Sequence, residues 1–204
     1  MSKVLYIKAN IKTKGMKSRT FQISEHFIDL YQKQNPNDEI EVLDLYEEGF
    51  QPLQEEDLYM LSAKRTDESK KDPKFKYAYQ FVNADKYVIA APMWNLGLPS
   101  ILKSYIDYAC LGGFCFKYTP EGQIGLLQDK KALFITSRGG IYSDEPFLSM
   151  DLDMGEKYLS KLFNVFGISD FNSIIAEKLD IQGLDTNQIV NNAMEEAEKI
   201  STTF

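Results

Sequence analysis

Two loops carry residue types suited to holding a ligand, and each follows an apolar run typical of a β-strand. One spans residues 90–99, after the run 87–91, and the other begins after the run 131–136. Pro92 and Pro99 each fix a backbone φ and lack an N–H group, so the first loop has few conformations to lose when a ligand binds. That loop also contains Trp94, the only tryptophan of the chain. We therefore expect preorganised amides and a surface for a flat molecule.

A third candidate site lies between the first predicted strand, at 4–7, and the first predicted helix. Ser18 is the N-cap candidate of that helix, in which Phe21, Phe27, Ile28 and Tyr31 recur near helical spacing. A helix N-terminus offers free N–H groups and the positive end of a dipole to an anion. Because the chain has no glycine fingerprint of a dinucleotide site or phosphate loop, hydroxyls at Thr13, Ser18 and Thr20 favour a phosphate monoester. A plain helix cap is the alternative.

The elements that must position these loops alternate along the chain. Apolar runs predict five strands, at 4–7, 40–45, 87–91, 131–136 and 171–176. Helical patterns are expected at 18–34, 73–84, 99–109, 151–166 and 186–202, with a short helix over 55–63. This alternation predicts an α/β fold with a doubly wound parallel sheet. In such sheets ligands bind beyond the carboxyl ends of the strands, where the strand order reverses, so the three loops should converge.

Composition narrows the function further. The chain has 204 residues with 44% apolar content, enough for one buried core, and we expect a single domain over 1–204. A net charge of −7 argues against nucleic acid or an anionic membrane surface as a partner. The start of the sequence passes directly into a strand, and no apolar run is long enough to span a bilayer, which predicts a cytoplasmic protein.

The few histidine and cysteine residues favour packing roles. His26 is the only histidine, so a histidine metal cluster is impossible, and we expect no metal site. Cys110 and Cys115 lack the spacing of a redox Cys-x-x-Cys motif, and buried cysteines commonly act as small hydrophobes. A redox role for the pair is the alternative. The charged residues between 64 and 72 are most simply a solvated surface, and the segment 46–74 is expected to contain the short helix over 55–63 and a mobile connection.

Several ordered blocks of the sequence together resemble one family, the FMN-dependent NADH azoreductases, also described as NADH:quinone oxidoreductases. The resemblance covers nearly the whole chain. The blocks that carry it are Lys3-Val4-Leu5-Tyr6-Ile7, Ala91-Pro92-Met93-Trp94-Asn95, Leu102-Lys103-Ser104-Tyr105-Ile106-Asp107, Phe116-Lys117-Tyr118-Thr119, Lys130-Lys131-Ala132 and Thr136-Ser137-Arg138-Gly139-Gly140.

The resemblance implies a flavodoxin-like three-layer sandwich with strand order 2-1-3-4-5, a non-covalent FMN in each subunit, and a homodimer with active sites at the interface. It places Asn10 and Ser18 at the FMN phosphate. Pro92 and the run Met93, Trp94, Asn95 and Leu96 would follow the ribityl chain and the pyrimidine side of the flavin. The pocket would be completed by Ser137, Arg138, Gly139 and Gly140.

Some positions depart from the family pattern. Family members often have hydroxyl residues where this chain has Ala9, Asn10 and Met16, so Lys17 or Arg19 would supply compensating cations. Tyr142 stands where some relatives place a histidine, and we assign it a flavin contact. Arg138 would either add positive charge beside the flavin or form an ordinary salt bridge. The two glycines let backbone amides approach the flavin edge that carries charge when reduced.

Four aromatic residues follow from the same comparison as candidates for a roof over the flavin or a platform for planar substrates. They are Trp94, Phe114, Phe116 and Tyr118. Packing at a dimer interface is the alternative for Phe114 and Phe116. Tyr118 is the candidate for a substrate contact.

The implied reaction has two steps, in which NADH or NADPH reduces FMN and leaves before a quinone or azo compound takes two electrons in the same pocket. No protein nucleophile is required, because the cofactor carries the redox chemistry. A flavodoxin-like one-electron carrier that docks through its acidic surface is the rival hypothesis, and a non-redox interaction module is a third. A carrier should stabilise the semiquinone during titration, whereas a two-electron reductase should not.

Overall fold

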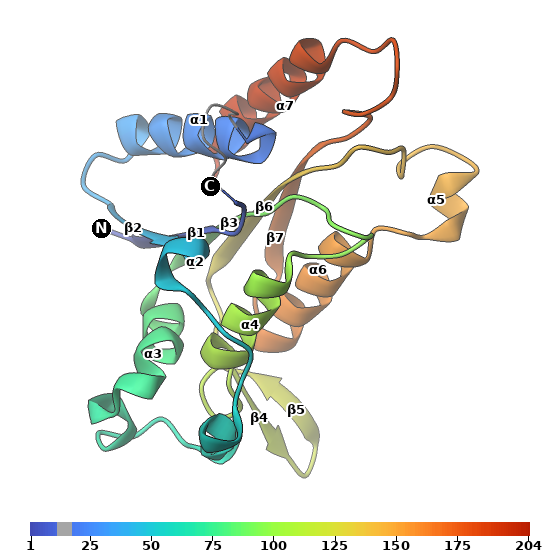
Figure 1. The fold of residues 1–204 in the computed structure, drawn as a ribbon. Helices are drawn as coiled ribbons and strands as arrows, with labels where there is room; N and C mark the ends of the chain where they lie inside the picture. The colour runs from blue at the N-terminus through green and yellow to red at the C-terminus, as the bar shows by residue number, and fades with distance from the viewer. Residues whose placement is uncertain (12–17) are drawn as a thin grey trace.

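A five-stranded parallel sheet forms the centre of the molecule (Figure 1). The computed structural model describes residues 1–11 and 18–204. The sheet order is β2-β1-β3-β6-β7, with β1 (Lys3–Lys8), β2 (Glu39–Asp44), β3 (Lys86–Ala90), β6 (Lys131–Ser137) and β7 (Asp170–Ala176). All four pairings are parallel. Counted within this sheet, the order is 2-1-3-4-5, so the predicted fold class is confirmed.

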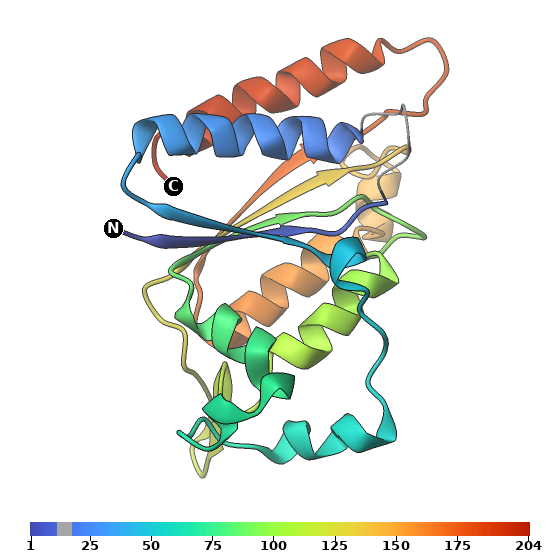
Figure 2. The same ribbon diagram turned by 60° about the vertical axis from the view of Figure 1, so that its left-hand side comes forward.

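Helices cover both faces of the sheet, as Figures 1 and 2 show. On one face lie α1 (Arg19–Gln34) and α7 (Thr186–Ser201), and on the other α3 (Lys76–Asn83), α4 (Ser100–Ala109) and α6 (Met154–Phe166). Two short helices, α2 (Leu45–Glu48) and α5 (Phe147–Met150), lie in connections. Because the central strands are buried on both faces, they have continuous apolar sequences, whereas edge strand β2 exposes Val42. Within the described residues, no helix is both long and apolar enough to cross a bilayer.

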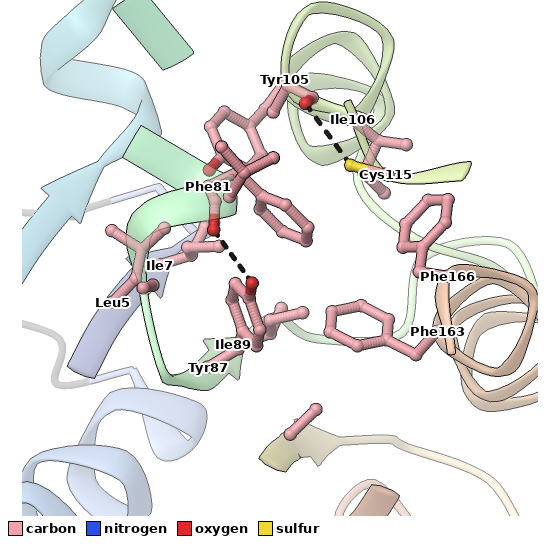
Figure 3. Close-up of a cluster of buried hydrophobic side chains, with 14 of the residues drawn as sticks. Leu5, Ile7, Phe81, Tyr87, Ile89, Tyr105, Ile106, Cys115, Phe163 and Phe166 are labelled. Atoms are coloured by element: carbon pink, nitrogen blue, oxygen red, sulfur yellow. Dashed lines mark hydrogen bonds between the residues drawn. The ribbon is translucent and has the colours of Figure 1, made fainter. Parts of the chain in front are cut away.

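The larger of the two cores lies between the sheet and the layer formed by α3, α4 and α6 (Figure 3). Phe81 of α3 stacks on Tyr87 of β3 with ring centroids 4.5 Å apart, and the Tyr87 hydroxyl donates to the Phe81 carbonyl at 2.8 Å. Phe163 of α6 meets the Tyr87 ring edge-on at 5.5 Å. The tyrosine hydroxyl thus keeps a partner while its ring is buried, as a core tyrosine requires.

The connection between β2 and α3 packs partly into the interior, which the sequence did not predict. The expected short helix at 55–63 is a 3₁₀ helix, η1 (Glu55–Ser62), and it places Met60 and Asp57 in the interior. The expectation of a short helix is confirmed, whereas the burial of these two residues was not predicted from the sequence. Short 3₁₀ turns at Ser69–Lys71 and Pro73–Phe75 then lead into α3.

The aromatic segment after α4 forms a β-hairpin, β4 (Phe116–Thr119) and β5 (Gly122–Gly125). The five strands predicted from the sequence do not include these two. Phe114 is 1% exposed and stacks on Phe75 at 5.7 Å, so the expectation that it roofs a flavin or packs at an interface is wrong. Phe116 is half-buried against Phe166 of its own chain. Of the three aromatic residues Phe114, Phe116 and Tyr118, Tyr118 alone is exposed, at 79%.

Asp57 links η1 to α4 and to the 3₁₀ turn at Pro73–Phe75. Its buried carboxylate pairs with the Lys74 ammonium, accepts from the Tyr108 hydroxyl of α4 at 2.6 Å, and accepts from the Gln54 amide at 3.0 Å. These bonds, that to Lys74 first, lower the pKa of Asp57 to about 2. Hydrogen bonds to a charged carboxylate favour its ionised form, and so they stabilise the fold while it is ionised.

We expect Asp57→Asn to lower the free energy of unfolding at pH 7, and this loss to shrink as the pH falls. A depressed folded-state pKa contributes stability that is complete above the unfolded value, about 4, and is lost as the pH falls toward 2. Urea unfolding of both proteins at pH 7 and pH 3 measures the difference. Glu55→Gln, on the same 3₁₀ helix, is the control, and a pH-independent gap would contradict the assignment.

Candidate active site

Three loops meet where the strand order reverses, at the carboxyl ends of β1, β3 and β6. The ladder of backbone bonds continues past the strands, with Ala9 N–H donating to the Ala90 carbonyl at 2.9 Å and Met93 N–H donating to the Ser137 carbonyl at 2.9 Å. In Figure 2 these loops lie at one end of the sheet. The predicted convergence of the three loops is present in the structure, at the position where open parallel sheets bind ligands.

The first corner of the site is the start of α1. Ser18 is the N-cap, as predicted, and its hydroxyl accepts from the Phe21 amide at 3.2 Å and from the Asn10 side-chain amide at 2.8 Å. Thr20 is buried and shares a 2.6 Å hydrogen bond with the Ser137 hydroxyl, so its expected role as an open phosphate donor is wrong. Lys17, Thr13 and Met16 lie outside the described residues. Arg19 pairs with Asp180 at 3.0 Å.

The loop after β3 makes a tight turn with an unusual backbone. Trp94 and Gly97 exchange both backbone hydrogen bonds at 3.0 Å, and the two residues between them, Asn95 and Leu96, have φ of 49° and 66°. Turns with two positive φ values favour asparagine and glycine, so leucine is strained here. Such strain of about 1–3 kcal/mol persists where the surroundings enforce it, commonly at functional sites. Pro92 is buried, whereas Trp94 is 38% exposed.

The loop after β6 is held against the segment that leaves β7. Asp180 N–H donates to the Gly139 carbonyl at 3.0 Å, and Lys178 N–H to the Gly140 carbonyl at 2.8 Å. A Cβ on Gly139 would overlap the Asp180 carboxylate, and one on Gly140 would come within 3.0 Å of the Tyr142 hydroxyl. Both contacts are with side-chain atoms, so a larger residue at either position would require Asp180 or Tyr142 to move.

Arg138 is buried at this edge and forms an ion pair, and whether it also places positive charge beside a flavin stays a prediction. Its Nη1 lies 2.8 Å from Oδ2 of Asp153, and its guanidinium carbon lies 5.5 Å from the centre of the Tyr142 ring. The Arg138 Nε has no hydrogen-bond partner among the described residues. The Tyr142 amide donates to the Glu177 carboxylate at 3.2 Å. Whether Tyr142 meets a flavin stays a prediction.

Most predicted site residues are therefore brought together, with Tyr118 as the exception. The polar corner, the strained turn and the glycine loop share one edge, whereas Tyr118 lies on the hairpin beyond α4 and α6 (Figure 2). Sequence reasoning missed Asp153 and Asp180. An aspartate directly before the helical pattern of α6 was the available signal for Asp153, and nothing local marked Asp180.

A hollow of about 630 Å³ lies beside the hairpin, and none of the three loops lines it. Its lining includes Lys64, Cys110, Phe116, Tyr118, Tyr158 and Leu162. Burial raises the pKa of Tyr158 to about 12 and that of the Cys110 thiol above its ordinary value. Cys110 and Cys115 are both free, and a protonated thiol is a poor nucleophile, which favours the packing interpretation.

The sheet order and the converging loops define a flavodoxin-like α/β protein with a polar corner at the start of α1. Residues 2–200 match a family profile described as flavodoxin-like fold. The chain is 52% identical to an FMN-dependent NADH:quinone oxidoreductase of Caldicellulosiruptor saccharolyticus and 54% identical to FMN-dependent NADH:quinone oxidoreductase 2 of Clostridium acetobutylicum, with all of each chain covered.

A solved structure resembles the whole chain closely. It is an FMN-dependent NADH-azoreductase from Bacillus anthracis in complex with FMN, 30% identical, with a TM-score of 0.87 over 100% of this chain and 99% of that one. The chain belongs to the flavodoxin-like family of FMN-dependent NADH:quinone oxidoreductases. The family expected from the sequence blocks is thereby confirmed.

Gly139→Ala should destabilise the protein by about 1–3 kcal/mol, because the new methyl group overlaps the short Asp180 side chain. Removing that side chain should relieve the overlap, so Gly139→Ala/Asp180→Ala is expected to unfold closer to Asp180→Ala alone. Thermal unfolding of the four proteins measures this. Gly112→Ala is the control, since its Cβ would meet Phe116 at an ordinary 3.7 Å. Additive losses would refute the contact.

Proposed function

We propose that this chain is an FMN-dependent oxidoreductase that uses NADH or NADPH to reduce quinones and azo compounds by two-electron, ping-pong transfer. The observation that carries the proposal is the convergence of a helix N-terminal polar corner, a strained Trp-bearing turn and a glycine loop at the switch point of the sheet. The names of the relatives, FMN-dependent NADH:quinone oxidoreductase and FMN-dependent NADH-azoreductase, support it. The whole chain would act as one FMN-binding domain.

The donor set at this edge fits a phosphate-bearing flavin. Asn10 and Ser18 present an amide and a hydroxyl at the N-terminus of α1, where a phosphate is favoured by the helix dipole. The unpartnered, buried Nε of Arg138 is a spare donor at the same edge. We assign the phosphate to Asn10 and Ser18, with Lys17 as a further cation.

The remainder of the cofactor would lie along the two other loops. Pro92, Met93, Trp94, Asn95 and Leu96 would hold the ribityl chain and the pyrimidine side of the flavin, and Ser137, Arg138, Gly139, Gly140 and Tyr142 would close the pocket. When bound, FMN supplies the acceptance of hydride and the return of two electrons. The protein orients the ring system, and loop amides favour the negative charge of the reduced ring.

We further propose a homodimer in which the hairpin of one subunit reaches the active site of the other. Tyr118 is exposed and belongs to a hollow that the three loops of its own chain do not line. Exposed apolar side chains occur on both η1 and β5, namely Leu58 and Leu61 on η1 and Ile124 on β5. Exposed apolar side chains of this kind are available to a partner. Tyr118 would then contact substrate above the flavin of its partner.

The test of the reaction is anaerobic stopped-flow spectroscopy of the FMN-loaded protein. Mixing with NADH should bleach the flavin absorbance rapidly, and a benzoquinone added next should restore it, with no build-up of one-electron-reduced flavin. Repeating the experiment with NADPH ranks the two donors. Bound FMN that neither nicotinamide reduces, together with a stable one-electron-reduced form on titration, would instead indicate an electron carrier.

Tyr118→Ala should lower kcat/KM for quinones about tenfold while leaving the FMN dissociation constant unchanged, since the residue would act on the partner's site. A second variant, Ser18→Glu, places negative charge at the phosphate corner and should abolish FMN binding. Mixed dimers of the two variants should recover the wild-type kcat/KM per bound FMN, because the one site that binds FMN then faces an intact Tyr118. Tyr46→Ala, far from the hairpin, is the control. No recovery in verified mixed dimers would contradict the shared site.

A further inference from the structure

We propose that Arg138 and Asp153 form a positioning pair that holds the loop after β6 and the strained turn after β3 in one fixed arrangement. Neither residue is assigned a chemical step. The inference rests on the proposed function only in that these two loops are the ones assigned to FMN. The proposal adds Asp153 to the residues on which the cofactor site depends. Arg138 would position the loops through its ion pair with Asp153.

Burial makes the ion pair a strong constraint. The side chains of Arg138 and Asp153 are 4% and 21% exposed, and their charged atoms lie 2.8 Å apart. Pairs of charged groups in hydrogen-bond contact are short and strong where water is scarce. Removing one partner from such a pair leaves the other charge uncompensated, which is strongly unfavourable. The guanidinium therefore has one favourable position.

Among the described residues, the backbone hydrogen bonds of residues 138–140 all go to the end of β7 and the segment that leaves it, so the Arg138 side chain adds a contact to a different element. Arg138 N–H donates to the Ala176 carbonyl at 2.8 Å, and Leu179 N–H donates to the Arg138 carbonyl at 3.2 Å, so both bonds face the β7 exit. The ion pair instead joins the Arg138 side chain to Asp153, at the start of α6. Together they fix residues 138–140 between two elements.

Asp153 in turn connects to the strained turn. One carboxylate oxygen caps α6 by accepting from the Glu156 amide at 3.1 Å, while the other meets Arg138. The next residue, Met154, donates its N–H to the Leu96 carbonyl at 3.0 Å. Leu96 is the residue with a φ of 66°. The first turn of α6 is thus bonded to one loop by a side chain and to the other by its backbone.

Close packing leaves little room for the two loops to adjust separately. A Cβ added at Gly155 would come within 3.2 Å of a Leu98 methyl and 3.4 Å of the Gly97 carbonyl carbon. The start of α6 therefore lies directly against the turn. If Asp153 shifts after losing its partner, both loops must shift with it, although they are about forty residues apart in sequence.

The test compares Asp153→Asn, Arg138→Gln and the double variant with the wild type. Asparagine is as good an N-cap as aspartate, so Asp153→Asn removes the ion pair while keeping the helix cap. Hydrogen exchange of the FMN-free chain should accelerate in both 93–98 and 138–142, with β1 unchanged. The FMN dissociation constant, measured by quenching of flavin fluorescence, should rise at least tenfold in each single variant. The double variant should have an FMN dissociation constant no higher than that of the single variant that binds FMN less tightly.

Asp151→Asn is the matched control, because this carboxylate lies two residues earlier in the same segment and pairs with exposed Lys157. It should leave exchange and FMN affinity within twofold of the wild type. Arg138→Lys serves if the other variants do not fold, and it should raise the dissociation constant about threefold or more. It should also accelerate exchange in both loops.

The outcomes separate this pair from the proposed function. Exchange that accelerates everywhere, in one loop only or in neither overturns the positioning role, as does an unchanged FMN affinity in variants with a lowered Tm. A wild type that binds no FMN contradicts the proposed function, and the exchange experiment still decides whether the pair positions the loops.

Discussion

The parallel register of β1, β3 and β6 is the constraint on which the rest of the structure depends. Lys8 pairs with Ala90, and Ala90 with Ile135, so the three strands end at the same level. The ladder then continues through Ala91 and Met93 into the loops, which makes the site an extension of the sheet. A slip of one residue would turn the buried side chains of a strand to the opposite face. The core therefore enforces the register, and the register places the loops.

Helix α6 connects the core to the site, because its later turns pack in the core and its first turn contacts the two loops. Its later turns bury Phe163 and Phe166 against the aromatic side chains of α3 and β3 (Figure 3). Its first turn carries Asp153 and Met154 to the two loops at the switch point. One helix can therefore contribute an apolar face to the core and hold the loops of the binding edge with the polar groups of its first turn. The strain at Leu96 is tolerable because this packing supports it.

The opposite side of the helix layer has a different character. There η1 and the hairpin form a hollow with exposed apolar and aromatic side chains, and Asp57 ties this region to α4 and Lys74. Tyr118 is exposed to solvent on a hairpin whose other residues are exposed or half-buried. The division of the molecule into a polar loop edge and an apolar hairpin edge is what favours a site completed by a second copy.

Local patterns in the sequence determined the strands, the helices and their caps. The apolar runs at 87–91 and 131–136, the cap at Ser18 and the helix start beside Pro99 depend on neighbours within a few residues, and the structure has all of them. The family blocks also located the loops of the candidate site. Only the tertiary structure decided that Thr20 bonds Ser137, 117 residues away, that Asp57 meets Tyr108, and that Phe114 is interior. Which distant groups become partners depends on the segments that the sheet brings together. Propensity and periodicity describe one segment at a time, so the pairing of Arg138 with Asp153 could be seen only in the folded chain.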